Sequence, residues 1–201
     1  MKEIIFGTTN PAKIIQAQAA LDPLGIVVRG LVGFENLPKV VEDGETAKEN
    51  ARKKAFAYCQ AIGQSVLSMD NGLYIDGLRE DEQPGIHTGR IPGFPARPSD
   101  EELIKYYSAL FEKHGGKMTG HWEFALCLAW PDGKTKEIIA IPPNRIFTNH
   151  VCAKRLAGYP LESMQIDPKT NKYIAEMTKE EQDKFWQESV GRELQELFKD
   201  F

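Results

Sequence analysis

The sequence predicts a protein of the α/β class, because segments typical of strands alternate with segments typical of helices along the chain. Two bulk properties agree with a packed domain. The chain has 201 residues, enough for one substantial domain, and 41% of them are hydrophobic, which argues against disorder. No internal repeat and no low-complexity linker interrupts the pattern. We therefore expect a single domain over residues 1–201.

The expected elements follow one another in a regular order. Each strand is a short apolar or alternating run, and most helices begin at a recognisable capping signal. We expect strands at residues 2–7, 25–31, 66–76, 121–130, 135–141 and 174–177, and helices at residues 11–22, 46–63, 99–110 and 190–198. A further helix start is expected at Thr178, directly after the last strand. A Pro-Asp-Gly turn separates the fourth and fifth strands, so these two predict a hairpin.

Charge and cysteine content exclude several classes of protein. The net charge of −4 provides no basic field for a nucleic-acid polymer. Cys59, Cys127 and Cys152 lack the spacing of metal ligands and predict reduced thiols in a cytoplasmic protein. No apolar run is long enough to be a signal peptide or to cross a bilayer. An anionic partner of this chain should therefore be a small molecule.

The loop after the first strand is a candidate anion site. Asn10 and Pro11 suit the N-cap and first position of a helix. A helix N-terminus attracts anions because its free amide groups and its dipole both face the ligand. Thr8 and Thr9 add hydroxyl donors, and Lys13 adds a positive charge. An ordinary capped helix is the commoner explanation of such a loop, and that alternative stays open.

Acidic residues precede the second helix, and a lysine lies within it. Thr46 and Glu49 have the spacing of a capping box at its start. Asn50 and Lys54 are four residues apart and share one face of this helix. Lys54 is therefore a candidate phosphate ligand, although a solvated lysine is the commoner outcome.

The stretch around Asp70 predicts a strand that delivers an acid to a turn. An apolar run leads to Asp70-Asn71-Gly72, and we expect Gly72 to adopt positive φ there. A carboxylate at such a place suits metal binding or water activation, whereas the simpler alternative is a local Asx turn. Further on, Arg90 lies in a loop of small residues, where a guanidinium suits an anion.

Taken together, these segments resemble the inosine triphosphate pyrophosphatase family, which cleaves non-standard purine nucleoside triphosphates. The likeness covers most of the chain and is strongest in its first half. It rests on Thr8-Thr9-Asn10-x-x-Lys13, Glu49-Asn50-Ala51 with Lys54-Ala55, Asp70-Asn71-Gly72-Leu73 with Asp76, the loop Pro84-Gly85-Ile86-His87-Thr88-Gly89-Arg90, and Ala175-Glu176-Met177.

The resemblance implies an elongated α/β fold with a central mixed sheet, two lobes and a cleft, a homodimer, and Mg²⁺ as cofactor. It implies catalytic roles for Asp70 and Lys54, and metal binding by Glu42 and Asp70. The implied substrate-binding residues are Thr8, Thr9, Asn10, Lys13, Asn71, Gly72, Arg90, Tyr159 and Glu162.

The late part of the chain departs from the family pattern. The family has Gly-Phe-Gly-Tyr-Asp-Pro where this chain has Gly158-Tyr159-Pro160-Leu161-Glu162-Ser163, and Gln182 stands where the family has a lysine. The family's Ser-His-Arg also has no counterpart. We therefore predict a nucleoside triphosphate pyrophosphatase with an altered base pocket. A nucleotide-binding protein without turnover and a purely structural module are the alternatives.

Overall fold

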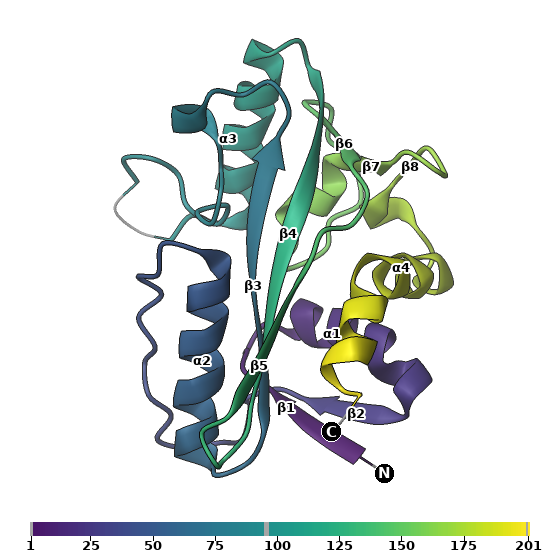
Figure 1. Ribbon diagram of the computed structural model, residues 1–201. Coiled ribbons are helices and arrows are strands. Elements are labelled where there is room, and N and C mark those ends of the chain that lie inside the picture. The colour runs from purple at the N-terminus through teal and green to yellow at the C-terminus, as the bar shows by residue number, and fades with distance from the viewer. Residues whose placement is uncertain (1, 95–96, 200) are drawn as a thin grey trace. The chain divides into compact units, whose positions relative to one another are not determined.

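The computed structural model describes residues 2–94, 97–199 and 201, and the chain forms two compact units. The first comprises Met1–Asn71, Glu123–Pro142 and Asp183–Phe201, and the second comprises Gly72–Trp122 and Pro143–Gln182. The strands form a mixed sheet in the order β2-β1-β3-β4-β6-β7-β8, with β5 paired to β4 (Figure 1). The predicted α/β class, with a central mixed sheet and flanking helices, is confirmed.

Three parallel strands lie at the centre of the first unit. β1 (Lys2–Phe6) pairs with β2 (Ile26–Arg29) on one side and with β3 (Val66–Ile75) on the other. The apolar run of β1 is almost completely buried, which is typical of a strand that is covered on both faces. Phe6 pairs with Leu67, so the loop after β1 begins beside the first residues of β3.

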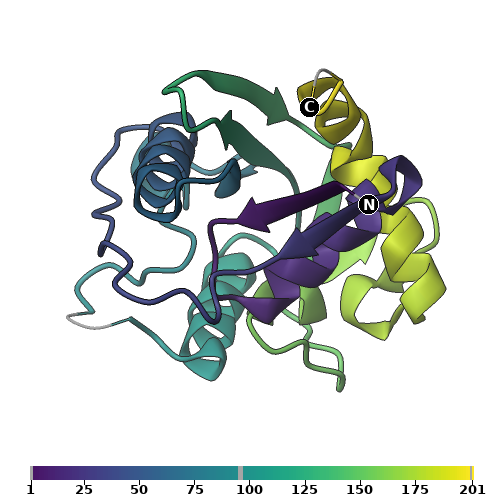
Figure 2. The same cartoon turned by 90° about the horizontal axis from the view of Figure 1, so that it is seen from below.

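Helices α1 (Pro11–Leu21), α2 (Ala47–Ile62) and α4 (Lys179–Leu197) contribute to this unit. Figure 2 shows α1 and α4 together on one side of β1 and β2, and α2 apart from them on the other side. The Gln187 side chain of α4 donates a hydrogen bond to the Ala19 carbonyl of α1 at 3.0 Å, which joins the two helices.

The predicted caps of α1 and α2 are largely confirmed. Asn10 Oδ1 accepts a hydrogen bond from the Ala12 amide at 3.0 Å, and proline occupies the first turn of α1. Thr46 Oγ1 accepts from the Glu49 amide at 3.1 Å, as a capping box requires. The Glu49 carboxylate, however, accepts from the Glu45 amide at 2.8 Å, so the prediction of a complete capping box is wrong by one residue.

The predicted hairpin is also confirmed. β4 (Lys117–Ala129) and β5 (Thr135–Ala140) pair antiparallel, from Phe124 with Ala140 to Ala129 with Thr135. The β5 side chain of Glu137 lies 3.1 Å from Lys48 of α2, which links the hairpin to that helix within the first unit.

The second unit packs α3 (Asp100–Lys113) against short strands. β6 (Arg145–Thr148), β7 (Gln165–Asp167) and β8 (Lys172–Tyr173) follow one another as antiparallel neighbours. Ser99 forms a complete capping box with Glu102 at the start of α3. The buried rings of Tyr107, Phe111 and Phe147 lie in contact and form the aromatic core of this unit.

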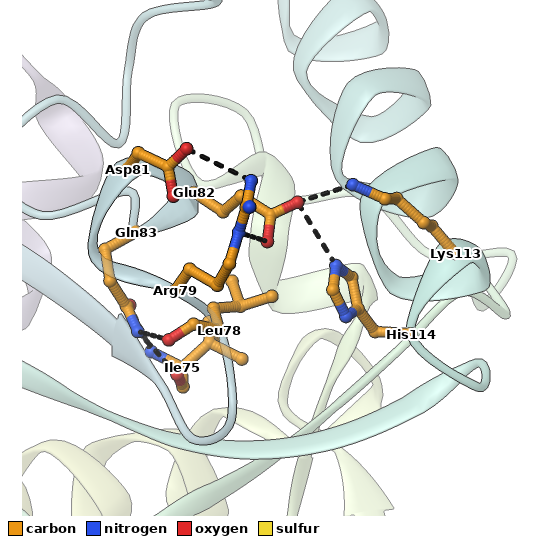
Figure 3. A network of polar contacts seen from close by, with 8 residues as sticks. All are labelled: Ile75, Leu78, Arg79, Asp81, Glu82, Gln83, Lys113 and His114. Atoms are coloured by element: carbon orange, nitrogen blue, oxygen red, sulfur yellow. Dashed lines mark hydrogen bonds and ion pairs between the residues drawn. The ribbon is translucent and has the colours of Figure 1, made fainter.

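A network of charges fixes the loop after β3 to the end of α3 (Figure 3). Glu82 lies at its centre: the carboxylate accepts hydrogen bonds from Lys113 and from Arg79, and His114 Nε2 lies 3.5 Å away. Hydrogen bonds from Lys113, chiefly, hold the pKa of Glu82 down to about 2. Gln83 adds a neutral tie, because its side chain pairs with both main-chain groups of Ile75.

The predicted turn at Asp70–Gly72 is wrong. β3 is continuous through these residues, and Gly72 does not have positive φ. The strand continues because Leu73 exchanges two main-chain hydrogen bonds of 2.9 Å with Gly85. A Cβ atom at Gly72 would lie 3.0 Å from the Tyr74 ring, so a close approach accounts for the glycine.

The structure near the C-terminus agrees with prediction in part. Residues Ile174–Glu176 form a 3-10 helix (η4) instead of a strand, since a run of buried apolar residues does not by itself identify the type of element. The helix start predicted at Thr178 is confirmed, because Thr178 and Glu181 form a reciprocal cap. The helix that begins there, α4, continues from Lys179 to Leu197 and so includes most of the closing helix predicted at residues 190–198. Among the described helices, none is long and apolar enough to cross a membrane.

Candidate active site

A lysine joins two carboxylates in the first unit. Lys54 Nζ, on the buried side of α2, lies 3.1 Å from Asp70 Oδ1 of β3 and 3.3 Å from Glu42 Oε1. The same ammonium group donates to the Met69 carbonyl at 3.2 Å. Lys54 and Asp70 are buried, whereas 43% of the Glu42 side chain is exposed. The predicted residues Glu42, Lys54 and Asp70 therefore lie together in one cluster.

The backbone that carries these groups explains why they meet. Lys54 and Asn50 occupy the same face of α2, and both are buried. Asp70 extends from β3, where buried neighbours on either side fix the strand. Glu42 lies in the segment before α2, and residues 42–46 run alongside the first turns of that helix, which brings Glu42 next to Lys54. We name Glu42, Lys54 and Asp70 the Lys54 cluster.

The loop between β1 and α1 is ordered by its own side chains. Thr8 Oγ1 accepts a hydrogen bond from the Asn10 amide at 3.1 Å, and the Thr8 carbonyl accepts from the Leu31 amide at 3.1 Å. Thr9 is exposed, and Lys13 is partly buried one turn into α1. The structure thus places Thr8, Asn10 and Lys13 around one helix N-terminus, where amide groups and the helix dipole favour an anion.

Strand register relates this loop to Asp70. The Gly7 amide donates to the Leu67 carbonyl at 2.7 Å, immediately before the loop begins. Asp70 lies three residues further along β3 in the same direction, because β1 and β3 are parallel. Loops at the carboxyl ends of parallel strands are the usual place for ligands in α/β sheets.

Asn71 is separated from the Lys54 cluster by strand geometry. Successive side chains of a strand point to opposite faces, so Asn71 faces away from Asp70. Its Oδ1 atom is buried and has no hydrogen-bond partner among the described residues. Gly72 lies on the same face as Asp70. The roles predicted for both residues stay predictions.

The donor set of the Lys54 cluster suits a hard divalent cation that keeps water ligands. Among the described residues, no group of three or more His, Cys, Asp or Glu side chains could hold a metal. Mg²⁺ commonly uses one or two carboxylates and completes its shell with water and substrate phosphates. Glu42 and Asp70 fit that requirement, with Lys54 as an additional positive group beside them.

A second polar cluster lies in the second unit. Gln165 Oε1 accepts hydrogen bonds from Arg145 and from Trp122 Nε1, each at 2.8 Å, and Arg145 Nη1 lies 3.9 Å from Glu162 Oε1. These polar side chains are buried. We name Arg145, Glu162 and Gln165 the Arg145 cluster. Tyr159 lies at the start of the short helix that carries Glu162, and it interacts electrostatically with Arg145 and Glu162.

Burial determines the charge states in the Arg145 cluster. Desolvation raises the pKa of Glu162 to about 7, against the opposing effect of Arg145. Desolvation also lowers the pKa of Arg145 to about 10, which is still high enough for the group to be cationic at neutral pH. The pKa of Tyr159 is raised, again chiefly by burial. Glu162 therefore titrates near neutral pH, where its protonated form can donate a hydrogen bond.

The departures from the family pattern have local structural explanations. Pro160 opens a 3-10 helix (η3, Pro160–Ser163), where the missing amide of proline is tolerated, and this helix buries Glu162. The Gln182 side chain donates a hydrogen bond to the Ile174 carbonyl at 3.2 Å and so ties the start of α4 to η4. Arg90 is exposed, and its amide closes a turn on the His87 carbonyl at 2.8 Å.

Sequence reasoning missed two members of the Arg145 cluster and several groups that contact the two clusters. The Met69 carbonyl that binds Lys54 belongs to the main chain and leaves no signal in the sequence. Arg145, Gln165 and Trp122 come from three separate strands and match no short motif. Their only sequence signal was polarity inside short apolar segments.

Comparison with known proteins identifies the family. The Ham1 family model matches residues 4–189. A protein named dITP/XTP pyrophosphatase from an Exiguobacterium species (strain AT1b) is 32% identical over 181 residues, covering 89% of this chain and 87% of that protein. A protein of the same name from Bacillus subtilis is 28% identical over 191 residues, covering 92% and 90%.

The fold agrees with a solved structure of this family. The structure of the Staphylococcus aureus Ham1 protein matches with a TM-score of 0.73 and 24% identity, covering 98% of each chain. The fold and the sequence matches together define an α/β protein of the Ham1 type. This chain belongs to the Ham1 family, and the resemblance to inosine triphosphate pyrophosphatases is confirmed.

Proposed function

We propose that this protein hydrolyses non-standard purine nucleoside triphosphates to the monophosphate and pyrophosphate, and so cleans the nucleotide pool. The observation that carries the proposal is the Lys54 cluster, in which a buried lysine bridges two carboxylates. The names of the relatives support the same reaction, since they are dITP/XTP pyrophosphatases. One functional domain over residues 1–201 is part of this proposal.

The reaction needs a water molecule that attacks the α-phosphorus in line with the leaving pyrophosphate. A bond forms between the water oxygen and phosphorus, the bond to pyrophosphate breaks, and one water proton must be accepted. We assign that proton to Asp70, whose Oδ1 atom is held by Lys54 at 3.1 Å. Lys54 orients this carboxylate and offers positive charge to the phosphates.

Mg²⁺ is the proposed cofactor, and Glu42 and Asp70 would hold it. When bound, Mg²⁺ offsets phosphate charge and lowers the pKa of a coordinated water molecule. The exposed side of Glu42 suits an ion that arrives with the nucleotide. Thr8, Thr9, Asn10 and Lys13 are assigned to the triphosphate, because they surround the N-terminus of α1.

The base is assigned to Tyr159 and Glu162. A tyrosine ring offers a stacking surface, and a protonated Glu162 offers both a hydrogen-bond donor and an acceptor to a purine edge. Arg90, Asn71 and Gly72 remain proposed substrate contacts. A homodimer and a cytoplasmic location are proposed as well. The resemblance supports the dimer, and three buried free cysteines agree with a reducing compartment.

The test is release of pyrophosphate from dITP, XTP, ITP, ATP and GTP with Mg²⁺. We expect turnover of the non-standard purines and a loss of about 10²–10⁴-fold in kcat for Asp70→Asn, because the proton acceptor is removed. Asp81→Asn, at an exposed aspartate of the second unit, is the matched control.

Calorimetry with the same nucleotides separates the main alternative. A nucleotide-binding protein without turnover would bind dITP or XTP but release no pyrophosphate. If the folded protein hydrolyses none of these nucleotides and Asp70→Asn has no effect on binding or turnover, the proposed function is wrong.

A further inference from the structure

The segment that carries Glu42 runs back along the first two turns of α2 and is tied to it repeatedly. The segment and the helix run antiparallel, so residues earlier in the segment contact residues later in the helix. The contacts are Thr46 Oγ1 with the Glu49 amide (3.1 Å), the Glu45 amide with Glu49 Oε2 (2.8 Å), the Gly44 amide with Asn50 Oδ1 (2.8 Å), Asp43 Oδ1 with Lys53 Nζ (2.7 Å) and Glu42 Oε1 with Lys54 Nζ (3.3 Å).

Only the central contact of this series is buried on both sides. Asn50 is 3% exposed and Gly44 is buried, whereas the contacts of Thr46 and Glu45 with Glu49 are exposed. The Asp43–Lys53 pair is exposed as well, and such pairs contribute little to stability. A buried amide that loses its acceptor, in contrast, pays the full cost of its desolvation. The Gly44–Asn50 hydrogen bond is therefore the main anchor of the segment.

The absence of a side chain at residue 44 makes this anchor possible. A Cβ atom there would lie 2.7 Å from Asn50 Oδ1 and 2.8 Å from the Glu49 Cβ atom. Contacts this short are not tolerated, so a larger residue would push the segment away from α2. Gly44 and Asn50 thus form a matched pair, in which one removes bulk and the other supplies the acceptor.

We infer that Asn50 is a positioning residue of the active site: by holding the Gly44 amide, it fixes where Glu42 presents its carboxylate beside Lys54. This inference rests on the function proposed for the Lys54 cluster. Asn50 and Lys54 extend from the same face of α2, one turn apart, so the anchor and the cluster share one rigid support.

The test compares three variants with the wild-type protein. Asn50→Leu keeps the size of the side chain but removes the acceptor, and Asn50→Asp keeps an acceptor oxygen in the same shape. Lys53→Met breaks the exposed tie in the same segment and is the matched control. Binding of Mn²⁺ alone, followed by the EPR signal of the free ion, needs no turnover, and the Mg²⁺ concentration for half-maximal activity adds a second readout.

We expect Asn50→Leu to weaken Mn²⁺ binding and to raise the half-saturating Mg²⁺ concentration by about 10–100-fold, the usual effect of losing a residue that orients a metal ligand. The KM for nucleotide at saturating Mg²⁺ should change little. Asn50→Asp should restore most of the loss, and Lys53→Met should stay within about twofold of wild type, as expected for an exposed pair. A folded Asn50→Leu variant that binds Mn²⁺ as the wild type does would overturn the inference.

A double-mutant cycle with Gly44→Ala gives an independent check. If both residues act through one contact, Gly44→Ala and Asn50→Leu should each weaken Mn²⁺ binding. The double variant should then bind Mn²⁺ no more weakly than the more impaired single variant does. Additive losses would contradict the shared contact. Should wild type bind Mn²⁺ in this Asn50-dependent way but release no pyrophosphate, the proposed function fails while the positioning role stands.

Discussion

The Lys54 cluster and the Arg145 cluster both combine a basic side chain with carboxyl groups, yet they differ in the distance between these groups and in their burial. In the first, the ammonium group contacts both carboxylates at 3.1 and 3.3 Å, and one of these carboxylates is 43% exposed. In the second, the guanidinium and the carboxyl group are 3.9 Å apart, and both side chains are at most 4% exposed.

The difference shows how burial changes what a carboxyl group can do. Burial penalises the charged form of a carboxyl group, and a close cation opposes that penalty. A carboxyl group in a dry site with a distant cation titrates near neutral pH, as Glu162 does. This difference agrees with the roles proposed for the two clusters, reaction for the first and recognition of the base for the second.

Of the variants that alter one of the two clusters, Lys54→Met should have the largest effect on activity. The variant keeps the length of the side chain but leaves Glu42 and Asp70 without their shared cation. We expect kcat to fall by about 10²–10³-fold, since a charged group aimed at the phosphates is lost. We also expect the unfolding free energy to fall by about 2 kcal/mol, because Asp70 is mostly buried.

The control for this prediction is Lys53→Met, one residue away. Its exposed pair with Asp43 should contribute less than about 1 kcal/mol. Activity and urea unfolding of both variants decide the outcome. Equal losses in the two variants would mean that the Lys54 cluster is no more than surface charge.

The two clusters also differ in how much of them could be predicted. The grouping of Asp70, Lys54 and Glu42 was predicted from the family resemblance, because these residues lie in or near short motifs that can be found in the sequence. Arg145 and Gln165 meet only because β6 and β7 are neighbours in a particular register, and nothing in either short segment encodes that register. Long-range pairing of this kind depends on the whole fold.

The same contrast holds for the secondary structure. The helix starts at Asn10 and Ser99 were predicted correctly, because a cap is a local interaction between residues close in sequence. The turn predicted at Gly72 was wrong, because pairing of Leu73 with Gly85 keeps β3 extended. A glycine that makes room for a neighbour and a glycine that turns the chain look alike in a sequence.

The next largest effect should come from Glu162→Gln and should depend on pH. Burial raises the pKa of Glu162 from 4.5 to about 7 in the folded protein. The folded state therefore holds the proton more tightly, so the stabilisation is complete below pH 4.5 and is lost as the pH rises through 7. The loss is at most about 3 kcal/mol, and glutamine, which stays neutral, removes this dependence.

Urea unfolding at pH 5 and at pH 8 measures this effect. The wild type should lose more stability between these values than Glu162→Gln does, whereas the exposed Glu180→Gln should behave as the wild type. Identical pH profiles of the wild type and Glu162→Gln would show that Arg145 keeps Glu162 ionised, and the contrast between the two clusters would disappear.

The smallest effect is expected from Glu82→Gln, which sharpens the contrast within the second unit. Hydrogen bonds from Lys113 and Arg79 lower the pKa of Glu82 to about 2, the opposite direction to Glu162 (Figure 3). Its stabilisation is present above pH 4.5 and is lost as the pH falls through 2, so the melting temperatures of the wild type and Glu82→Gln should differ at pH 7 and converge in acid.

Because Lys113 and Arg79 are mostly exposed, added salt should reduce the difference at pH 7. Asp81→Asn, which removes only an exposed contact with Arg79, should leave the melting temperature almost unchanged. A difference that persists in acid would mean that Glu82 stabilises the loop by packing and not by charge.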